Sequence, residues 1–367
     1  DEDSCDTLRL NSTQIFHDRG AHVWHGDVKD FDAKPFSNKL DLLLGGPPCQ
    51  PFSNGGQKSG FSDSRDMFPE YISILNETRP KAFLIENVKG LSSARFSEYL
   101  SYIKLQLQYV EAAQRLRGGW NDRLSKLQKL RSSNVTGSYQ LYSAVLNSVD
   151  FGVPQSRERL FMIGFRSDLK VDWQWPEPTH SSDALFYSQF VSGDYYDRHD
   201  LRRPKPTDAQ ATRARLMKIA GRPKGKAYKT VRDALSGLPE PEMRNAHPTI
   251  ANHIGIPGAR SYHGHTGSPL DLPAKTLKAG VHGCPGGENM AAYADGRVRY
   301  FSVREAARLQ PFPDSYVFSG SISDCTRQIG NAVPVELAKL LVSRMKVMLA
   351  VKPRRHAVVA PSRPLEL

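Results

Sequence analysis

Short apolar runs alternate with segments of helical periodicity through the first half of the chain. Four apolar runs predict buried strands, at residues 40–44, 82–85, 141–149 and 160–165. Apolar residues recur at helical spacing in two intervening segments, residues 67–75 and 96–107. This alternation predicts an α/β domain with a mostly parallel sheet. In such sheets ligands bind beyond the carboxyl ends of the strands, where Cys49 and Glu86 fall.

The pattern changes in the later parts of the chain. Residues 104–131 are predicted to be a helical insertion with a break at its glycine pair, and we interpret it as a helix hairpin packed on the core rather than a functional arm. Residues 173–297 show little periodicity and predict a second, smaller, loop-rich domain. Regular patterns return over 298–350, which we assign with 1–172 to the first domain. Residues 351–367, rich in proline and arginine, are predicted to be a disordered tail.

The charge of the chain indicates what kind of partner it binds. The 367-residue chain has a formal net charge of +12, and a polyanion is the natural partner of such a balance. Between Arg202 and Arg232, eleven lysines and arginines stand against one acid, Asp208. Interrupted by proline and glycine, they suit a surface that follows phosphates. A basic, well-solvated surface is the plainer alternative.

Composition argues against several classes of protein. The sequence contains no run of about 18 apolar residues, so no membrane span is predicted, and its acidic start is unlike a secretory signal. The four cysteines are scattered without Cys-x-x-Cys spacing, which fits free thiols in a reducing compartment. His263 and His265 lack companion ligands at metal spacing, so no metal site is expected.

Cys49 has surroundings that suit a nucleophile. It follows a predicted strand in the segment 45–50, GGPPCQ, where prolines stiffen the loop. A thiolate is a strong nucleophile once its pKa is lowered or a base is near. Taken alone, the cysteine is better explained as a buried hydrophobe. Glu86, Arg157 and Arg159 reverse that judgement, because they also flank predicted strands and can share one pocket, although a helix cap and sheet-edge ion pairs are the structural alternatives.

Five segments resemble the signatures of the cytosine-5 DNA methyltransferase family. Each alone is only suggestive, but all five occur in the family's order. The resemblance covers nearly the whole chain outside 104–131 and 173–297. It implies a Rossmann-like S-adenosylmethionine-dependent methyltransferase sheet, with 173–297 as the target-recognition domain. The segments are Pro47-Pro48-Cys49-Gln50, Glu86-Asn87-Val88, Gln155-x-Arg157-x-Arg159, residues 303–314, and Gln328-Ile329-Gly330-Asn331-Ala332-Val333.

The resemblance also implies what the residues do. A cytosine flipped out of duplex DNA is attacked at C6 by Cys49, and its C5 receives a methyl group from S-adenosylmethionine. Glu86 binds N3 and the exocyclic amine and should have a raised pKa, while Arg159 binds O2. Arg157 supports the catalytic loop or contacts DNA, and residues 54–64 close over the base.

Two further sets of contacts complete the predicted site. The resemblance implies that S-adenosylmethionine is held by Asp27, Pro47, Met67, Asn331, Ala332 and Val333. It also implies that Gln50 and Ser53 either support the catalytic loop or contact DNA. The basic stretch and the loop at 273–276 add three candidate DNA contacts, Arg202, Arg203 and Lys275.

One signature of the family does not occur in the sequence. The family opens with a strand and a glycine-rich turn, Asp-x-Phe-x-Gly-x-Gly-Gly, which holds the methionine part of the cofactor. Because no such turn precedes Cys49, we expect an upstream segment to be missing and the chain as given to bind the cofactor poorly.

The leading functional hypothesis is a monomeric bacterial enzyme, cytoplasmic and associated with the nucleoid, that methylates cytosine as the partner of a restriction enzyme. The size and basic character of 173–297 favour duplex DNA as its substrate. Two alternatives stay open: a tRNA-methylating member of the same family, and a truncated remnant that binds DNA without activity.

Overall fold

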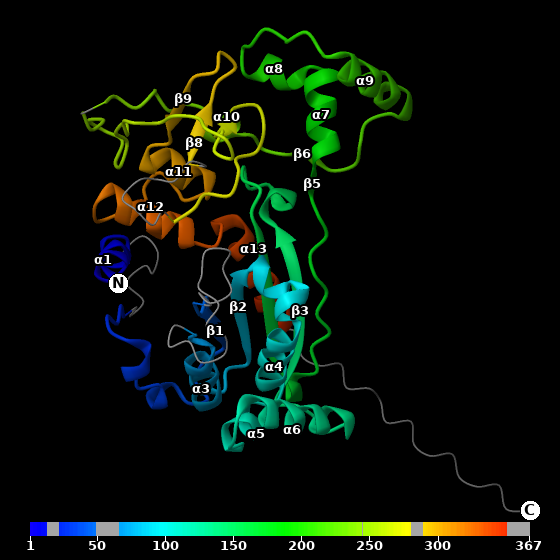
Figure 1. Ribbon diagram of the computed structural model, residues 1–367, viewed down its shortest axis with the longest axis vertical. Helices are drawn as coiled ribbons and strands as arrows, with labels where there is room; N and C mark the ends of the chain where they lie inside the picture. The colour runs from blue at the N-terminus through cyan, green and yellow to red at the C-terminus, as the bar shows by residue number, and fades with distance from the viewer. Residues whose placement is uncertain (13–21, 49–65, 244, 280–288, 351–367) are drawn as a thin grey trace, which may run out of the picture.

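The main sheet and its helices form the lower part of the molecule in Figure 1, and shorter elements gather above them. The computed structural model describes residues 1–12, 22–48, 66–243, 245–279 and 289–350. Several predicted features lie outside the described residues: Cys49, Gln50, Ser53, the loop 54–64 and the tail 351–367.

Four strands form the main sheet in the order β1-β2-β4-β3. They are β1 (Leu42–Gly45), β2 (Ala82–Val88), β3 (Tyr139–Asn147) and β4 (Glu158–Arg166). β1 and β2 run parallel, whereas β4 runs antiparallel to both β2 and β3. Three of the four described strands, β1, β2 and β3, therefore run in the same direction, as predicted, and only β4 opposes them. The short link 148–157 explains the reversed direction of β4, because it leaves no room for the crossover that a parallel pair of β3 and β4 would require.

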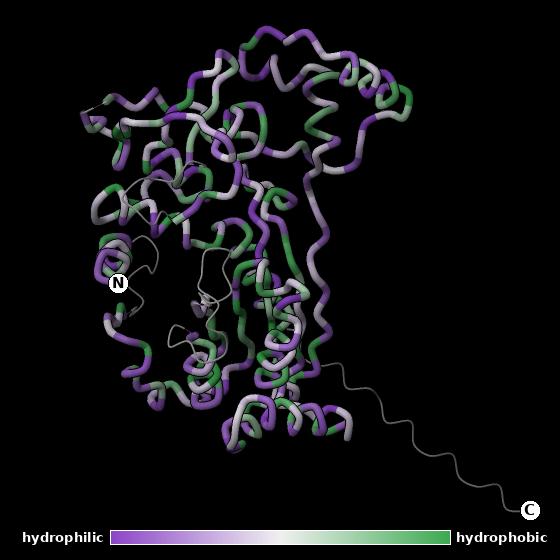
Figure 2. The backbone as a smooth tube through the Cα atoms, viewed as in Figure 1, coloured by the Kyte–Doolittle hydropathy of each residue, from purple (hydrophilic) through white to green (hydrophobic). Residues whose placement is uncertain are grey.

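Alternating side chains give this sheet two apolar faces, and its strands are largely hydrophobic in Figure 2. Phe83 and Ile85 pack with α3 and α4, while Leu84 packs with α13. Because side chains alternate along a strand, Glu86 follows Leu84 toward the α13 face and Asn87 follows Ile85 toward the other. The covering helices are α3 (Phe68–Thr78), α4 (Ser97–Gln108) and α13 (Val335–Ala350).

The predicted helical insertion forms two helices, α5 (Val110–Arg115) and α6 (Trp120–Ser132). Val110 and Leu127 are buried in the same cluster as the α3 and α4 face of the sheet. The predicted break falls before α6, where Gly118 has a φ of +105°, a conformation that favours glycine. Both helices lie at the foot of the sheet in Figure 1, opposite the strand ends that carry the candidate site.

The upper part of the molecule is built from short elements. One group contains α7 (Ser182–Phe190), α8 (Asp194–Arg198) and α9 (Asp208–Ala220), with β5 (His180–Ser181) paired in parallel to β6 (Lys226–Ala227). The other contains β7 (Ser268–Pro269), β8 (Met290–Ala292) and β9 (Val298–Tyr300), with α10 (Val231–Leu235), α11 (Val303–Leu309) and α12 (Ile322–Asn331). The proposed boundary at residue 297 falls between β8 and β9, which pair antiparallel, and the domain limits stay a prediction.

The first helix, α1 (Glu2–Leu10), is tied to a segment far along the chain. The Asn11 side chain donates to the Val317 carbonyl at 2.7 Å and accepts the Val317 N–H at 2.9 Å. The Thr7 hydroxyl accepts the Ser319 N–H at 2.9 Å. These bonds hold α1 beside the approach to α12. Single 3-10 turns occupy η1 (Val28–Asp30), η2 (Lys34–Phe36), η5 (Lys89–Ser92), η6 (Ala94–Phe96), η7 (Ser148–Phe151) and η8 (Ser167–Leu169).

Candidate active site

Glu86 and Arg159 form a buried ion pair at the upper end of the sheet. The pairing of β2 with β4 sets Val88 opposite Arg159, so the Arg159 and Glu86 side chains meet on one face. Arg159 Nε lies 2.9 Å from Glu86 Oε1, and the two side chains are only 16% and 12% exposed. The sequence prediction that these two residues share a pocket agrees with this geometry.

Burial dominates the electrostatics of this pair. It raises the pKa of the Glu86 carboxyl by more than the charges of Arg159 and Arg157 lower it. It also lowers the pKa of the Arg159 guanidinium by more than the Glu86 charge raises it. Both shifts disfavour the charged forms, so Glu86 takes up a proton more readily than an exposed glutamate. The predicted direction of the Glu86 pKa is the one found.

The loop after β1 is held against this pair. Asn87, which is 6% exposed, donates from Nδ2 to the Pro47 carbonyl at 2.9 Å. The Met67 N–H donates to the Pro48 carbonyl at 3.3 Å, so the start of α3 fixes the next residue of the loop. A Cβ built on Gly46 would lie 3.7 Å from Glu86 Oε2, which places the loop backbone beside the carboxyl group. Pro48 immediately precedes Cys49 in the sequence.

Arg157 joins the sheet to two later segments of the chain. Its guanidinium donates to the Leu277 carbonyl at 3.1 Å and to the Gly330 carbonyl at 2.6 Å. Burial, followed by the like charge of Arg159, lowers its pKa to about 9, so the group remains charged at neutral pH. The residue is 2% exposed, which leaves it no surface for DNA in the described structure. Of its two predicted roles, this geometry favours support of the site.

We call the contacts of Arg157 with Leu277 and Gly330 the buried joint. Gln155 and Gln310 extend it, and neither residue was assigned a role from the sequence. Gln155 donates to the Leu309 carbonyl at 3.3 Å and accepts the Leu277 N–H at 2.9 Å. Gln310 donates to the Ile329 carbonyl at 2.9 Å. The sequence did offer a signal for these two residues, because each glutamine lies inside a signature segment, and a polar side chain that is buried there must find hydrogen-bond partners.

Replacing Arg157 with lysine is expected to destabilise the protein by about 1.5–3 kcal/mol, because a single ammonium cannot reproduce the two-carbonyl geometry of the guanidinium. Urea unfolding measures this difference. Arg131→Lys, at an exposed position on α6, is the matched control and should change stability by less than about 0.5 kcal/mol. Equal stability of the two variants would contradict the proposed joint.

The predicted cofactor residues fall into separate groups. Pro47 and Met67 belong to the loop contacts described above. Asn331 is the last residue of α12, and Ala332 and Val333 follow it. All three come directly after Gly330, whose carbonyl accepts a hydrogen bond from Arg157. Asp27 caps η1, and one of its carboxylate oxygens accepts the Lys29 N–H at 3.0 Å. Within the described ranges, no hydrogen bond or ion pair joins Asp27 to the other groups.

The residues predicted to contact DNA differ in whether their charged groups are already bonded to other side chains of the protein. Arg203 pairs with Asp197 at 2.6 Å, and the Lys275 ammonium donates to the Thr266 hydroxyl at 2.8 Å. Arg202 is exposed and forms no ion pair with any residue that the structure describes. Gln50 and Ser53 lie outside the described residues.

The described residues also bear on membrane spans and metal sites. Over the part of the chain that the structure covers, no helix has the length and apolarity to cross a membrane. The same part holds no cluster of three or more histidine, cysteine, aspartate or glutamate side chains arranged for a metal ion.

Comparison with known proteins defines the class of this fold and site. The family model described as C-5 cytosine-specific DNA methylase matches residues 1–111 and 119–347. The chain therefore belongs to the C-5 cytosine-specific DNA methylase family, as the sequence signatures predicted. Enzymes of this family use S-adenosylmethionine as the methyl donor, which confirms the predicted enzyme class and cofactor.

Similar proteins include bacterial modification enzymes. The chain is 30% identical over 325 residues to the type II methyltransferase M.AplI of Arthrospira platensis, covering 87% of this chain and 72% of that protein. It is 29% identical over 346 residues to M.Eco47II of Escherichia coli, covering 92% and 70%. A putative DNA modification methyltransferase from an E. coli prophage shares the fold, with a TM-score of 0.53, 22% identity, and coverage of 95% and 90%.

Proposed function

We propose that this chain methylates C5 of a cytosine that has been flipped out of a specific duplex DNA sequence. The buried Glu86–Arg159 pair, beside the loop that leads to Cys49, is the observation that supports this most strongly. The match to type II methyltransferases favours DNA over tRNA as the substrate. We further propose that the enzyme acts as a monomer in a bacterial cytoplasm, associated with the nucleoid, and protects DNA from a partner restriction enzyme.

The three proposed catalytic residues divide the chemistry among them. The Cys49 thiolate forms a bond to C6, which pushes electron density toward C5 and N3 of the ring. Protonated Glu86 donates to N3 and so stabilises the charge that develops there. Arg159 donates to O2 and keeps Glu86 oriented. When the C5 proton is lost to solvent, the electrons of that bond restore the ring and expel the thiolate.

The residues predicted for the cofactor have chemistry that fits it. Asp27 is exposed, and one carboxylate oxygen is not used by the Lys29 bond, so it remains available to an adenine amine. Met67 is partly exposed and offers apolar surface to an aromatic ring, whereas Pro47 is buried behind the loop. Asn331, Ala332 and Val333 are at least partly exposed and would complete the walls. Bound S-adenosylmethionine supplies the methyl group. Arg157 is proposed as a positioning residue, because it acts through the backbone at Gly330 and Leu277.

Transfer of label from tritiated S-adenosylmethionine tests the proposed function. Purified protein is incubated with duplex genomic DNA or with bulk tRNA, and acid-insoluble tritium is counted on each. We expect label on DNA, at C5 of cytosine after hydrolysis to nucleosides. Label on tRNA alone would replace DNA as the substrate, and no label on either would show that this chain is not an active enzyme.

A further inference from the structure

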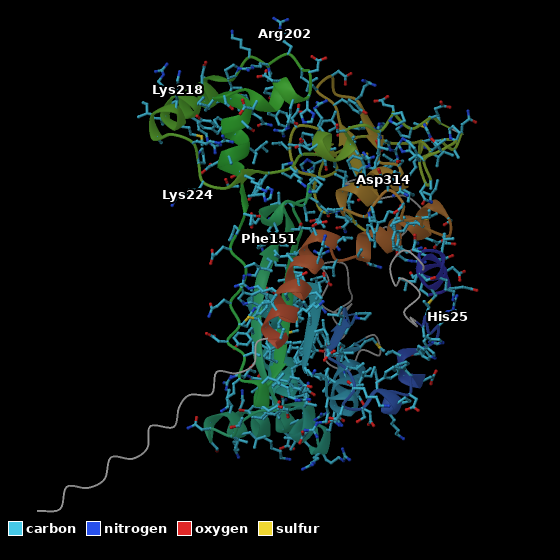
Figure 3. All side chains as sticks on the ribbon, turned by 180° about the vertical axis from the view of Figure 1, so that it is seen from behind. His25, Phe151, Arg202, Lys218, Lys224 and Asp314 are labelled. Carbon is cyan, nitrogen blue, oxygen red and sulfur yellow. The ribbon has the colours of Figure 1, made fainter. Side chains whose placement is uncertain are left out.

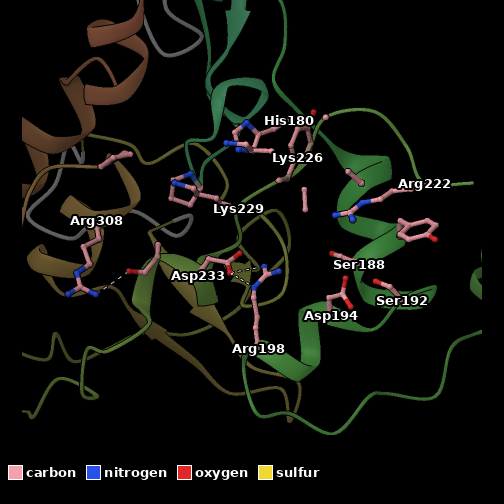
Figure 4. Close-up of a pocket in the computed structure, with 18 residues that line it drawn as sticks. His180, Ser188, Ser192, Asp194, Arg198, Arg222, Lys226, Lys229, Asp233 and Arg308 are labelled. Atoms are coloured by element: carbon pink, nitrogen blue, oxygen red, sulfur yellow. Dashed lines mark hydrogen bonds and ion pairs between the residues drawn. The ribbon is translucent and has the colours of Figure 1, made fainter.

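A cavity separate from the Glu86–Arg159 pair opens in the upper part of the molecule. It has a volume of about 600 Å³ and lies among α7, α8, β6 and α11. Figure 4 shows His180, Lys226 and Lys229 on one side of it and Arg222 with Ser188 and Ser192 on the other. We call this cavity the basic pocket.

Positive charge in the basic pocket exceeds negative charge. Arg198 and Arg308 line it, but they are paired with Asp233 at 2.8 Å and Asp314 at 2.6 Å. Across the described ranges, three other lining cations form no ion pair with a carboxylate: Arg222, Lys226 and Lys229.

Two carboxylates line the pocket, and one of them is already compensated. Asp233 accepts bonds from Arg198, His199 and the Thr230 backbone. Burial raises the pKa of the Asp233 carboxyl, but the bonds from Thr230 and Arg198 lower it by more. The carboxyl group therefore stays ionised, and its charge is balanced by these partners. Asp194 is exposed and is the remaining negative charge among the described lining residues. The pocket therefore favours an anion.

The cationic wall is fixed by backbone structure. The parallel pairing of β5 with β6 sets His180 opposite Lys226. The Thr179 hydroxyl lies 2.8 Å from His180 Nδ1, and the ring packs so closely on Gly152 that a Cβ there would approach it to 2.6 Å. Burial, and then the charges of Lys229 and Lys226, lowers the pKa of His180, so both lysines act on the same small volume.

A buried hydroxyl also points to a ligand. Ser192 lines the pocket, and its Oγ is shielded from solvent yet has no hydrogen-bond partner within the described structure. Such groups are uncommon, because leaving a buried hydroxyl unpaired costs free energy. An oxygen-rich anion in the pocket would accept this hydrogen bond as well as those of the lysines.

Two features connect the pocket to DNA rather than to a free ion. Pro154, which lines it, is three residues before Arg157 of the joint at the candidate active site. Three more cations, Lys218, Lys224 and Arg202, form no ion pair with a residue that the structure describes, and they lie along the outer part of the same region in Figure 3. A row of phosphates, unlike a single ion, would use both the pocket and this outer row.

We propose that the basic pocket binds phosphates of the DNA backbone beside the cytosine that is methylated. This inference rests on the proposed function, because it assumes that duplex DNA is the substrate. Neutralised phosphates release counterions, so each contact contributes about 0.9 to the slope of log affinity against log salt. Backbone contacts carry no sequence information, so their loss weakens all duplexes alike.

The test measures binding of a fluorescent 30-base-pair duplex at several salt concentrations. The double variant Lys226→Gln/Lys229→Gln should lower the magnitude of the salt slope by about 2 and weaken binding about tenfold or more at low salt. The matched control, Lys129→Gln/Lys346→Gln, removes two exposed lysines from α6 and α13 and should leave the slope unchanged. Asp194→Asn should strengthen binding, because it removes the uncompensated carboxylate.

The outcomes separate this proposal from the proposed function. Equal slopes for the double variant and its control would overturn the pocket assignment even if the wild-type protein methylates DNA. Stabilisation of the wild type by inorganic pyrophosphate, together with unchanged DNA slopes, would assign the pocket to a free anion instead. A wild type that binds duplex with the expected slope but transfers no label would refute the proposed function alone.

Discussion

The Cys49→Ala variant is expected to transfer methyl groups at least about 10⁴-fold more slowly than the wild type, because the Cys49 thiolate is the nucleophile of the proposed mechanism. The described loop brings the backbone at Gly46 beside the Glu86 carboxyl, and Asn87 and Met67 hold the next two residues, Pro47 and Pro48, by their carbonyls. The measurement is tritium transfer to duplex DNA at saturating substrate. The variant should still bind DNA, since only a thiol is lost.

Covalent trapping makes this test independent of rate. In the presence of S-adenosylmethionine, duplex in which fluorine replaces the C5 hydrogen of cytosine should form a denaturation-resistant adduct with the wild type. Once C5 carries both fluorine and the transferred methyl group, it has no proton whose loss would expel the thiolate. Cys49→Ala should form none. Cys5→Ala, a change at a half-buried cysteine on α1, is the matched control and should behave as the wild type. Cys325 is a poor competitor, because burial raises the pKa of its thiol to about 11. An adduct that persists in Cys49→Ala would remove this residue as the nucleophile.

Glu86→Gln is expected to reduce the rate at saturating substrate by about 10²–10⁴-fold, since an amide can donate to N3 but cannot transfer a proton to it. The control is Glu158→Gln, an exposed neighbour on β4 whose carboxylate pairs with Lys89 at 2.8 Å. That variant should retain most of its activity. If both variants lose activity equally, the effect belongs to the surface charge and Glu86 has no special role.

The pH profile gives a second measure of Glu86. Its pKa is raised by burial, and the protonated form is the one that donates to N3, so activity should fall as pH rises through that raised pKa. Ionisation of the Cys49 thiol works in the opposite direction and should give a rising limb. In Glu86→Gln the falling limb should disappear while the rising limb remains. A falling limb that survives in Glu86→Gln must come from another group.

Much of the catalytic half of the fold was predictable from the sequence because each of its elements has a strong local pattern. The apolar runs at β1, β2 and β4 and the periodic segments at α3 and α4 appear where predicted. Glu86 and Arg159 were also predicted to meet, because both adjoin strands of one sheet. The direction of β4 was not predictable from periodicity, since a buried strand has the same apolar pattern whichever way it runs.

Long-range polar contacts were the part that the sequence did not reveal. An arginine before a strand is typical of a surface, yet Arg157 is buried because carbonyls from residues 277 and 330 receive its guanidinium. Those partners are far away in the sequence and become visible only in the folded chain. The basic stretch was recognised as a whole, but ion pairs such as Arg203 with Asp197 decide which of its charges remain free.

The buried joint around Leu277 has a consequence for how such enzymes can diversify. Leu277 and Ala274 are bonded to residues 155–157, so the segment after residue 273 is anchored to the catalytic part. On the other side, the Thr179 N–H donates to the Asp150 carbonyl at 2.9 Å, just before α7. The stretch between these two anchors forms a cassette. The family resemblance predicts that this stretch reads the DNA sequence. We therefore expect recombination between relatives at the two anchors to exchange the recognised sequence and leave the chemistry intact.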